Sequence, residues 1–206
     1  MALLLLKKNS IPLLIAFILC LELIIYLWAV WTTEADFVFA KSTRNSGRAS
    51  SAINLIILLM IGYYGLKEIY LDDKKKDTFR ILITLFALNH FIHLFFLIQN
   101  FKSYALELNL SENKHGFVTF IFILIIPIIL WTFKNLNRVL YAGLTLHLFN
   151  VSYFIMETLY HKITPDKPSY HSQLGIAVTI FALHYILYRF FRENKLSAPP
   201  NVSDGV

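Results

Sequence analysis

Charged residues are scarce in this chain: 16% of its 206 residues are Asp, Glu, Lys or Arg, and 57% are hydrophobic. A soluble domain carries about 25% charged and about 45–50% apolar residues. Glycine and proline, the residues that break helices, are scarce as well, with 7 and 6 copies. The composition therefore excludes an ordinary soluble protein and predicts an all-α membrane bundle built from continuous helices.

The motifs of common soluble enzymes are also missing. The sequence has no phosphate-binding glycine-rich loop, no nucleophile elbow, no zinc-protease histidine pair and no paired-cysteine motif. Its single cysteine, Cys20, cannot form an intrachain disulfide. The formal charge of +6 would suggest nucleic acid in a soluble chain. Here the basic residues lie where membrane topology places them, so we expect no nucleic-acid partner.

Uncharged windows bounded by polar segments predict six membrane-spanning helices. They cover about residues 11–31, 50–70, 79–100, 116–134, 138–160 and 172–192. Residues 1–196 would form one transmembrane domain, and residues 197–206 a disordered tail. The first apolar run is longer than the roughly 7–15-residue core of a cleaved signal peptide, so we expect a retained span, with cleavage as the alternative.

The distribution of basic residues predicts how the bundle is oriented. The N-terminal side of the predicted topology carries 12 of the 19 Lys and Arg residues, and the opposite side carries 7. Because cytoplasmic loops are enriched in positive charge, both termini are predicted to be cytoplasmic. The expected location is an inner or plasma membrane of bacterial type.

A few polar side chains lie within the predicted spans. They are Glu22 in the first, Asn89, His90 and His93 in the third, His147 and Asn150 in the fifth, and His184 in the sixth. At 1.5 Å per residue, Glu22, His90, His147 and His184 lie about 12–17 Å from the inner end of their helices. Ionisable residues at membrane depth usually face the bundle interior or a cavity. We therefore expect these four residues to share one site, open towards the outer face.

A metal centre is the first hypothesis for this site, because three histidines and a carboxylate match a catalytic site that keeps one position open. His90, His147 and His184 would bind Zn or Fe. Glu22 would be a general base or a further ligand, and Asn150 or Asn89 would orient a ligand. The protein would then be a metal-dependent membrane enzyme, a hydrolase or an oxidoreductase, acting on a lipid or another membrane-soluble substrate.

Three alternatives remain open. One is an electron-transfer protein that binds haem b between histidines of different helices, with His93 beside the haem and Gly143 making room for it. Another is a proton-coupled transporter in which Glu22 and the histidines relay protons. Scarce glycine and a single notable mid-span proline, Pro127, count against this alternative. The last is a subunit of a larger membrane complex or a homo-oligomer, because lipid-facing helices offer surfaces that a partner could cover.

Overall fold

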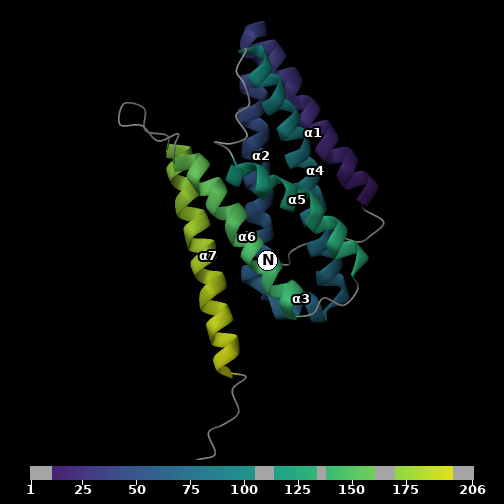
Figure 1. The fold of residues 1–206 in the computed structure, drawn as a ribbon, viewed down its shortest axis with the longest axis vertical. Coiled ribbons are helices and arrows are strands. Elements are labelled where there is room, and N and C mark those ends of the chain that lie inside the picture. Colours follow the sequence, from purple (N-terminus) through teal and green to yellow (C-terminus); the bar gives the residue numbers. More distant parts are fainter. Residues whose placement is uncertain (1–10, 105–113, 134–137, 161–169, 197–206) are drawn as a thin grey trace, which may run out of the picture.

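The computed structural model describes residues 11–104, 114–133, 138–160 and 170–196, and every regular element among them is a helix (Figure 1). The elements are α1 Ile11–Thr32, the short 3-10 helix η2 Ala35–Phe37, α2 Val38–Tyr64, α3 Leu66–Leu71, α4 Asp73–Ser103, α5 Lys114–Thr132, α6 Arg138–Tyr160 and α7 Tyr170–Leu196. The predicted all-α class is confirmed. The predicted tail, residues 197–206, lies outside the described residues.

Three helical stretches of the described chain are long and apolar enough to cross a membrane: Ile11–Thr32, Ala35–Tyr64 and Asp73–Ser103. The apolar segment Gly116–Thr132 of α5 is shorter. Helices α6 and α7 occupy the ranges of the last two predicted spans, but their described residues do not meet the same criterion of length and apolarity. A multi-helix protein suited to a membrane is therefore supported, while the full count of six spans stays a prediction.

Helix α2 lies at the centre of the arrangement, between α1 and α4 on one side and α7 on the other. Helix α2 runs antiparallel to α1, because Lys41 contacts Thr32 and Ser46 contacts Glu22. It also runs antiparallel to α4, because Gly47 contacts His93 and Ser50 contacts Asn89. Helix α5 packs on α4, and α6 packs on α5 and α7. The main apolar core gathers side chains from α2 to α7. Its most deeply buried members include Ile57, Met60, Ile69, Phe79 and Leu130.

The helix in place of the second predicted span, 50–70, begins and ends earlier in the sequence than predicted. Helix α2 begins at Val38 and ends at Tyr64, and Gly65, with a φ of 79°, separates it from the short helix α3. The helix continues through the charged segment before residue 50 because Arg44 and Arg48 are exposed, while serines from the same turns are buried. The predicted end was wrong because a positive φ at glycine stops the helix where hydropathy alone does not.

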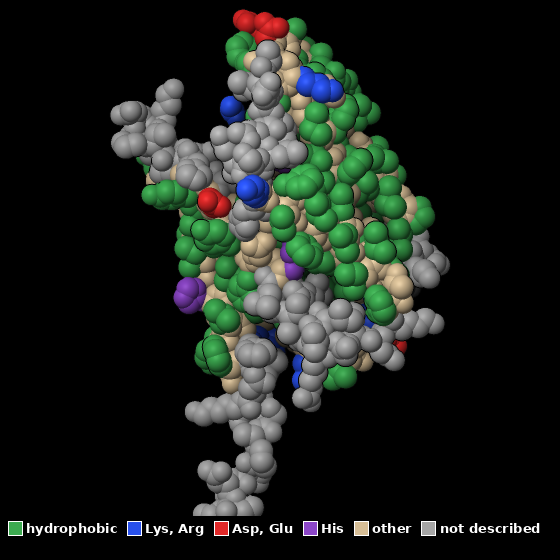
Figure 2. Space-filling model, viewed as in Figure 1, with side chains coloured by type: hydrophobic (Ala, Val, Ile, Leu, Met, Phe, Trp, Pro, Cys, Tyr) green, Lys and Arg blue, Asp and Glu red, His purple; other side chains and the backbone are tan. Residues whose placement is uncertain are grey.

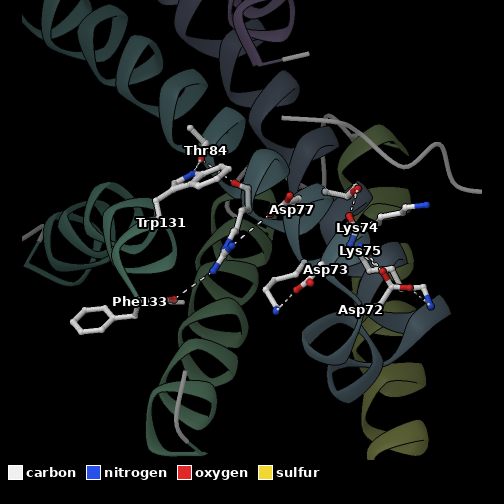
Figure 3. A network of polar contacts seen from close by, with 11 residues as sticks. Asp72, Asp73, Lys74, Lys75, Asp77, Thr84, Trp131 and Phe133 are labelled. Atoms are coloured by element: carbon white, nitrogen blue, oxygen red, sulfur yellow. Dashed lines mark hydrogen bonds and ion pairs between the residues drawn. The ribbon is translucent and has the colours of Figure 1, made fainter. Parts of the chain in front are cut away.

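The turn between α3 and α4 is held by ionic and capping contacts (Figure 3). Asp72 caps α4 by accepting hydrogen bonds from the backbone N–H groups of Lys74, at 2.9 Å, and Lys75, at 3.2 Å. The Lys75 ammonium is hydrogen-bonded to Glu68 on α3 and lies 4.8 Å from the centre of the Tyr64 ring. These contacts join the end of α2, the whole of α3 and the start of α4.

A second set of contacts joins α4 to α5 at the same end of the bundle (Figure 3). Arg80 donates a hydrogen bond to the carbonyl oxygen of Phe133 at 3.3 Å and lies 5.6 Å from the centre of the Trp131 ring. The Trp131 indole N–H donates to the Thr84 hydroxyl at 3.0 Å. These contacts hold the end of α5 against α4.

Hydrophobic side chains cover most of the right-hand part of the face seen in Figure 2, and charged side chains gather at its top. Many large apolar side chains of α1 point outwards. They include Leu13, Phe17, Leu23, Ile24, Trp28 and Trp31, the last of which is 81% exposed. Water-soluble monomers rarely expose contiguous apolar surface on this scale, whereas a lipid-facing helix must. The outside of α1 therefore suits contact with lipid.

Candidate functional site

The polar face of α2, formed by Ser42, Ser46, Ser50 and Asn54, lies inside the bundle. The four residues recur every fourth position, so they line one side of the helix. None of them is more than 2% exposed. Small polar side chains let helices approach closely and supply hydrogen bonds between them. This face is therefore where α2 can hold a polar group from α1 or α4.

Glu22 of α1 is that polar group. Its side chain is 2% exposed, and its Oε1 atom accepts a hydrogen bond from the Ser46 hydroxyl at 3.0 Å. The side-chain amide of Asn89 on α4 donates a second hydrogen bond to the same oxygen. Glu22 therefore connects α1, α2 and α4, which contain the three described stretches that are long and apolar enough to cross a membrane.

The network continues from Asn89 along α2 and α4. The Ser50 hydroxyl donates to Asn89 Oδ1 at 2.6 Å, and His90 Nδ1 lies 3.2 Å from the Ser50 oxygen. Because a serine hydroxyl has one hydrogen, this arrangement requires His90 to donate from Nδ1 to Ser50. We call Glu22, Ser46, Ser50, Asn89 and His90 the Glu22 cluster. In this cluster a chain of hydrogen bonds through Asn89 and Ser50 links the two ionisable side chains, Glu22 and His90.

Aromatic rings and the backbone of a glycine surround His90 and the neighbouring His93. The His90 ring stacks on Phe120 of α5, with 5.8 Å between ring centres, and lies 5.3 Å from Phe86. His93, one turn further along α4, is 5.5 Å from His90. Its Cε1 atom lies 3.1 Å from the point at which a Cβ atom on Gly47 would stand. The two histidines are thus packed among α2, α4 and α5.

The remaining predicted site residues lie against other neighbours. Asn150 of α6 donates to Thr119 of α5 at 2.9 Å. His147 packs on Phe122, with 5.5 Å between ring centres, and its Nε2 atom is buried without a hydrogen-bond partner. His184 is exposed on α7, and its Nδ1 lies 3.0 Å from the backbone oxygen of Ile180. Gly143 lies within α6, but its surroundings fall outside the described part of the chain.

The predicted ligand set His90, His147 and His184 is not assembled in the described part of the chain. No group of three or more His, Cys, Asp or Glu side chains among the described residues is arranged to hold a metal ion. One physical reason is depth: His184 adjoins Tyr185, which packs on Gly62 of α2, 16 residues from the Ser46 that binds Glu22, or about 24 Å at 1.5 Å per residue. The rotation of each helix decides which neighbour its side chain meets, and for His147 and His184 these are a phenylalanine ring and the helix's own backbone.

Sequence reasoning found Glu22, Asn89 and His90 but missed the serines that bind them. Ser42 and Ser46 precede the predicted second span, so they fell in a predicted outer loop. The signal was nevertheless present, because Ser42, Ser46, Ser50 and Asn54 follow a four-residue period through the charged segment. A period of small polar residues facing a lone carboxylate in a neighbouring span indicates a buried hydrogen-bonding face.

One further polar contact crosses the centre of the bundle. The side-chain amide of Asn54 on α2 donates to the Ser152 hydroxyl on α6 at 3.3 Å, and both residues are almost completely buried. The polar face of α2 thus meets α1 and α4 along Ser46 and Ser50, and α6 at Asn54.

No known protein family, curated protein or solved structure matches this chain.

Proposed function

We propose that the chain is a six-span integral membrane transport protein with both termini in the cytoplasm, and that Glu22 binds a proton that is moved during transport. One observation carries the proposal. Glu22 is buried within apolar helices, its Oε1 atom accepts two hydrogen bonds, and its Oε2 atom has no partner. Ionisable side chains held in this way inside a membrane bundle are characteristic of ion pathways and proton relays.

The second titratable group of the cluster supports the same function. His90 reaches Asn89 through Ser50, and Asn89 reaches Glu22, so a change of charge at either ionisable group alters the hydrogen bonds available to the other. His93 stands one turn away along the same helix. Two ionisable groups joined through polar side chains of three helices can couple proton binding to a relative movement of those helices.

The topology in this proposal is supported by how the helices end. Arg189, near the C-terminal end of α7, donates to the backbone oxygens of Gly62 and Tyr63, near the C-terminal end of α2. Helices α2 and α7 therefore finish at the same end of the bundle, as the second and sixth of six alternating spans would. The excess of Lys and Arg on that side favours the cytoplasm.

The metalloenzyme and haem hypotheses gain less support from the described residues. A three-histidine centre needs ligands that converge, and the described residues contain no such group. For haem b, axial histidines from two helices must face each other across the macrocycle. In the described structure His90 stacks on Phe120 and His147 lies against Phe122, so phenylalanine rings of α5 occupy the position next to each histidine.

Infrared difference spectroscopy of the protein in lipid vesicles tests the proton site without knowledge of the transported solute. A carboxylic acid in an apolar site shows a C=O stretching band that a carboxylate lacks. We expect this band to change in amplitude with bulk pH and to disappear in Glu22→Gln. Glu157→Gln, which removes a half-buried carboxyl group of α6, is the matched control and should leave the band unchanged. A Glu22 band that stays constant at every pH would refute proton exchange.

A further inference from the structure

Three buried polar atoms without a hydrogen-bond partner lie on the polar face of α2 or on the carboxyl group that it holds. They are Ser42 Oγ, Asn54 Oδ1 and Glu22 Oε2. Their residues are 0%, 2% and 2% exposed. Buried polar atoms almost always have partners, and bound water supplies the partner where protein atoms do not. Ser42 and Asn54 lie on either side of the position where α2 holds Glu22. A row of water molecules along this face would give all three atoms a hydrogen-bond partner.

The two ends of this face differ in character. Towards the start of α2, the neighbouring turns carry Lys41, Arg44, Asn45 and Arg48, all of them at least partly exposed. The Arg48 guanidinium donates to Asn45 Oδ1 at 3.3 Å. Polar atoms thus continue from the buried face to the surface at this end.

Beyond Asn54 the same helix becomes wholly apolar inside the bundle. Ile57, Leu58, Met60 and Ile61 are each no more than 3% exposed. They pack in one cluster with apolar side chains of other helices, which include Phe79, Leu82 and Phe86 of α4, Val151 of α6 and Ile186 of α7. Water has no polar partner in such a layer. The apolar layer therefore closes the polar face at the end of the bundle where α2 finishes.

We propose that the polar face of α2 is a one-sided water path that delivers protons to Glu22 from the end of the bundle where α2 begins. The inference rests on the proton site proposed for Glu22. A hydronium ion in the path gives its proton to Oε2 of the carboxylate and leaves as water, so the carboxylic acid is the only product retained. The hydroxyls of Ser42 and Ser46 bind the water molecules, and the layer from Ile57 to Ile61 prevents their passage to the other side.

The charged groups around Glu22 are compatible with this direction. On α4 the ionisable side chains of the neighbouring turns are His90, which is linked to the carboxyl group only through Ser50 and Asn89, and His93, which packs on Gly47 beside Ser46. On α2 the cations Lys41, Arg44 and Arg48 lie near the start of the helix, where the proposed path opens, and are at least partly exposed to solvent.

Cysteine accessibility tests the path, and the chain suits it because Cys20 is its only cysteine. In a Cys20→Ser background, Ser42→Cys and Ser46→Cys report on the path, and Ile57→Cys and Ile61→Cys report on the apolar layer. All four positions are equally buried, with exposures of 0–3%. A difference in reactivity must therefore come from water in the path rather than from static exposure.

The exposed positions Glu34 and Asp73 supply the reference for sidedness. Glu34→Cys marks the end of the bundle where α2 begins, and Asp73→Cys marks the end where it finishes. The probe is a membrane-impermeant, positively charged methanethiosulfonate, applied separately to each side of oriented vesicles. We expect Ser42→Cys and Ser46→Cys to react at least about tenfold faster than Ile57→Cys and Ile61→Cys, and only from the side on which Glu34→Cys reacts.

Equal reactivity at the serine and isoleucine positions would overturn the proposal and reduce the face to a packing surface. Reaction of Ser42→Cys from the Asp73 side would overturn it as well. A second variant tests the route itself: Ser42→Leu should abolish labelling of Ser46→Cys while Glu34→Cys still reacts. The infrared band of Glu22 is measured independently. One-sided labelling with a band that does not titrate would refute the proton site and leave the water path standing.

Discussion

The His93 imidazole of α4 packs directly on the backbone of Gly47 in α2. A Cβ atom at position 47 would stand 3.1 Å from His93 Cε1, closer than side chains normally pack. Gly47 lies one residue beyond Ser46 and three before Ser50, both of which hold the Glu22 cluster together. The absence of a side chain at this position therefore sets how closely α4 approaches α2 beside that cluster.

Gly47→Ala should destabilise the protein in spite of the better helix propensity of alanine. The gain in propensity is about 1 kcal/mol, and forcing an atom into a packed contact costs about 1–3 kcal/mol. In a His93→Ala background the contact is gone, so the same substitution should stabilise the fold by about 1 kcal/mol. Denaturation in mixed micelles measures both values. A Gly47→Ala effect of the same sign and size in the two backgrounds would disprove the packing explanation.

The hydrogen bond between Ser50 and Asn89 should be visible in a double-mutant cycle. Ser50→Ala and Asn89→Ala each remove one partner of a fully buried contact. Hydrogen bonds between membrane helices contribute about 0.6 kcal/mol on average, with a maximum of about 1.7 kcal/mol. The 2.6 Å contact leads us to expect a coupling energy in the upper part of that range.

The matched control for this cycle pairs Asn89→Ala with Thr43→Ala. Thr43 donates to the backbone oxygen of Phe39 in its own helix, so it shares no side-chain partner with Asn89. Effects of independent sites add within about 0.3–0.5 kcal/mol. A coupling for Ser50 and Asn89 that is no larger than this control would show that the hydrogen bond does not contribute to stability.

Helix positions followed closely from hydropathy, and the reason is visible in α1, α4, α5 and α6. Helices α1, α5 and α6 begin and end within two residues of the predicted spans, and α4 begins six residues before its span, at Asp73. The agreement follows because charged side chains collect where helices leave the apolar layer. Helix α2 departs from the rule: its charges line an exposed side while its serines are buried. Hydropathy averages over a helix turn, so it cannot distinguish a loop from a helix with one polar and one packed side.

The site was predictable in part for a related reason. Depth along a helix is estimated from the sequence, and the common depth expected for Glu22 and His90 agrees with the network in which Asn89 and Ser50 link them. The rotation of each helix about its axis follows from packing against neighbours, which the sequence of one chain does not state. His147 and His184 contact Phe122 and Ile180 instead. His184 also differs in depth, because the adjacent Tyr185 packs on Gly62, 16 residues along α2 from the Ser46 that binds Glu22. Side chains on separate helices converge only when depth and rotation agree.

Gly65 should be intolerant of any substitution that adds a side chain. Its backbone, with φ 79° and ψ 147°, is a conformation essentially reserved for glycine. We expect Gly65→Ala to cost about 1–3 kcal/mol of unfolding free energy. Gly65→Asn should cost as much, because asparagine relieves strain only in the left-handed helical region, where ψ is smaller. If Gly65→Asn were clearly better tolerated than Gly65→Ala, the turn would have a different geometry.

Acidification should loosen the turn between α3 and α4 through Asp72. The backbone N–H of Lys75 donates a hydrogen bond to this carboxylate and, aided by the N–H of Lys74 and the Lys75 ammonium, holds the pKa of Asp72 below its ordinary value of 3.8. A group with a lowered folded-state pKa binds fewer protons when folded than when unfolded. Its stabilising contribution is therefore complete above pH 3.8 and is lost as the pH falls through the lower folded-state value.

Asp72→Asn separates this titration from the helix cap itself. Asparagine is also a good N-cap residue but has no carboxyl group to protonate. Unfolding measured from neutral pH to pH 2 should show a decline below the ordinary pKa in the wild type and a shallower decline in Asp72→Asn. Glu34→Gln is the control, because Glu34 is exposed and its side chain makes no capping hydrogen bond. If both substitutions flattened the profile equally, the acid response would reflect net charge rather than the α4 cap.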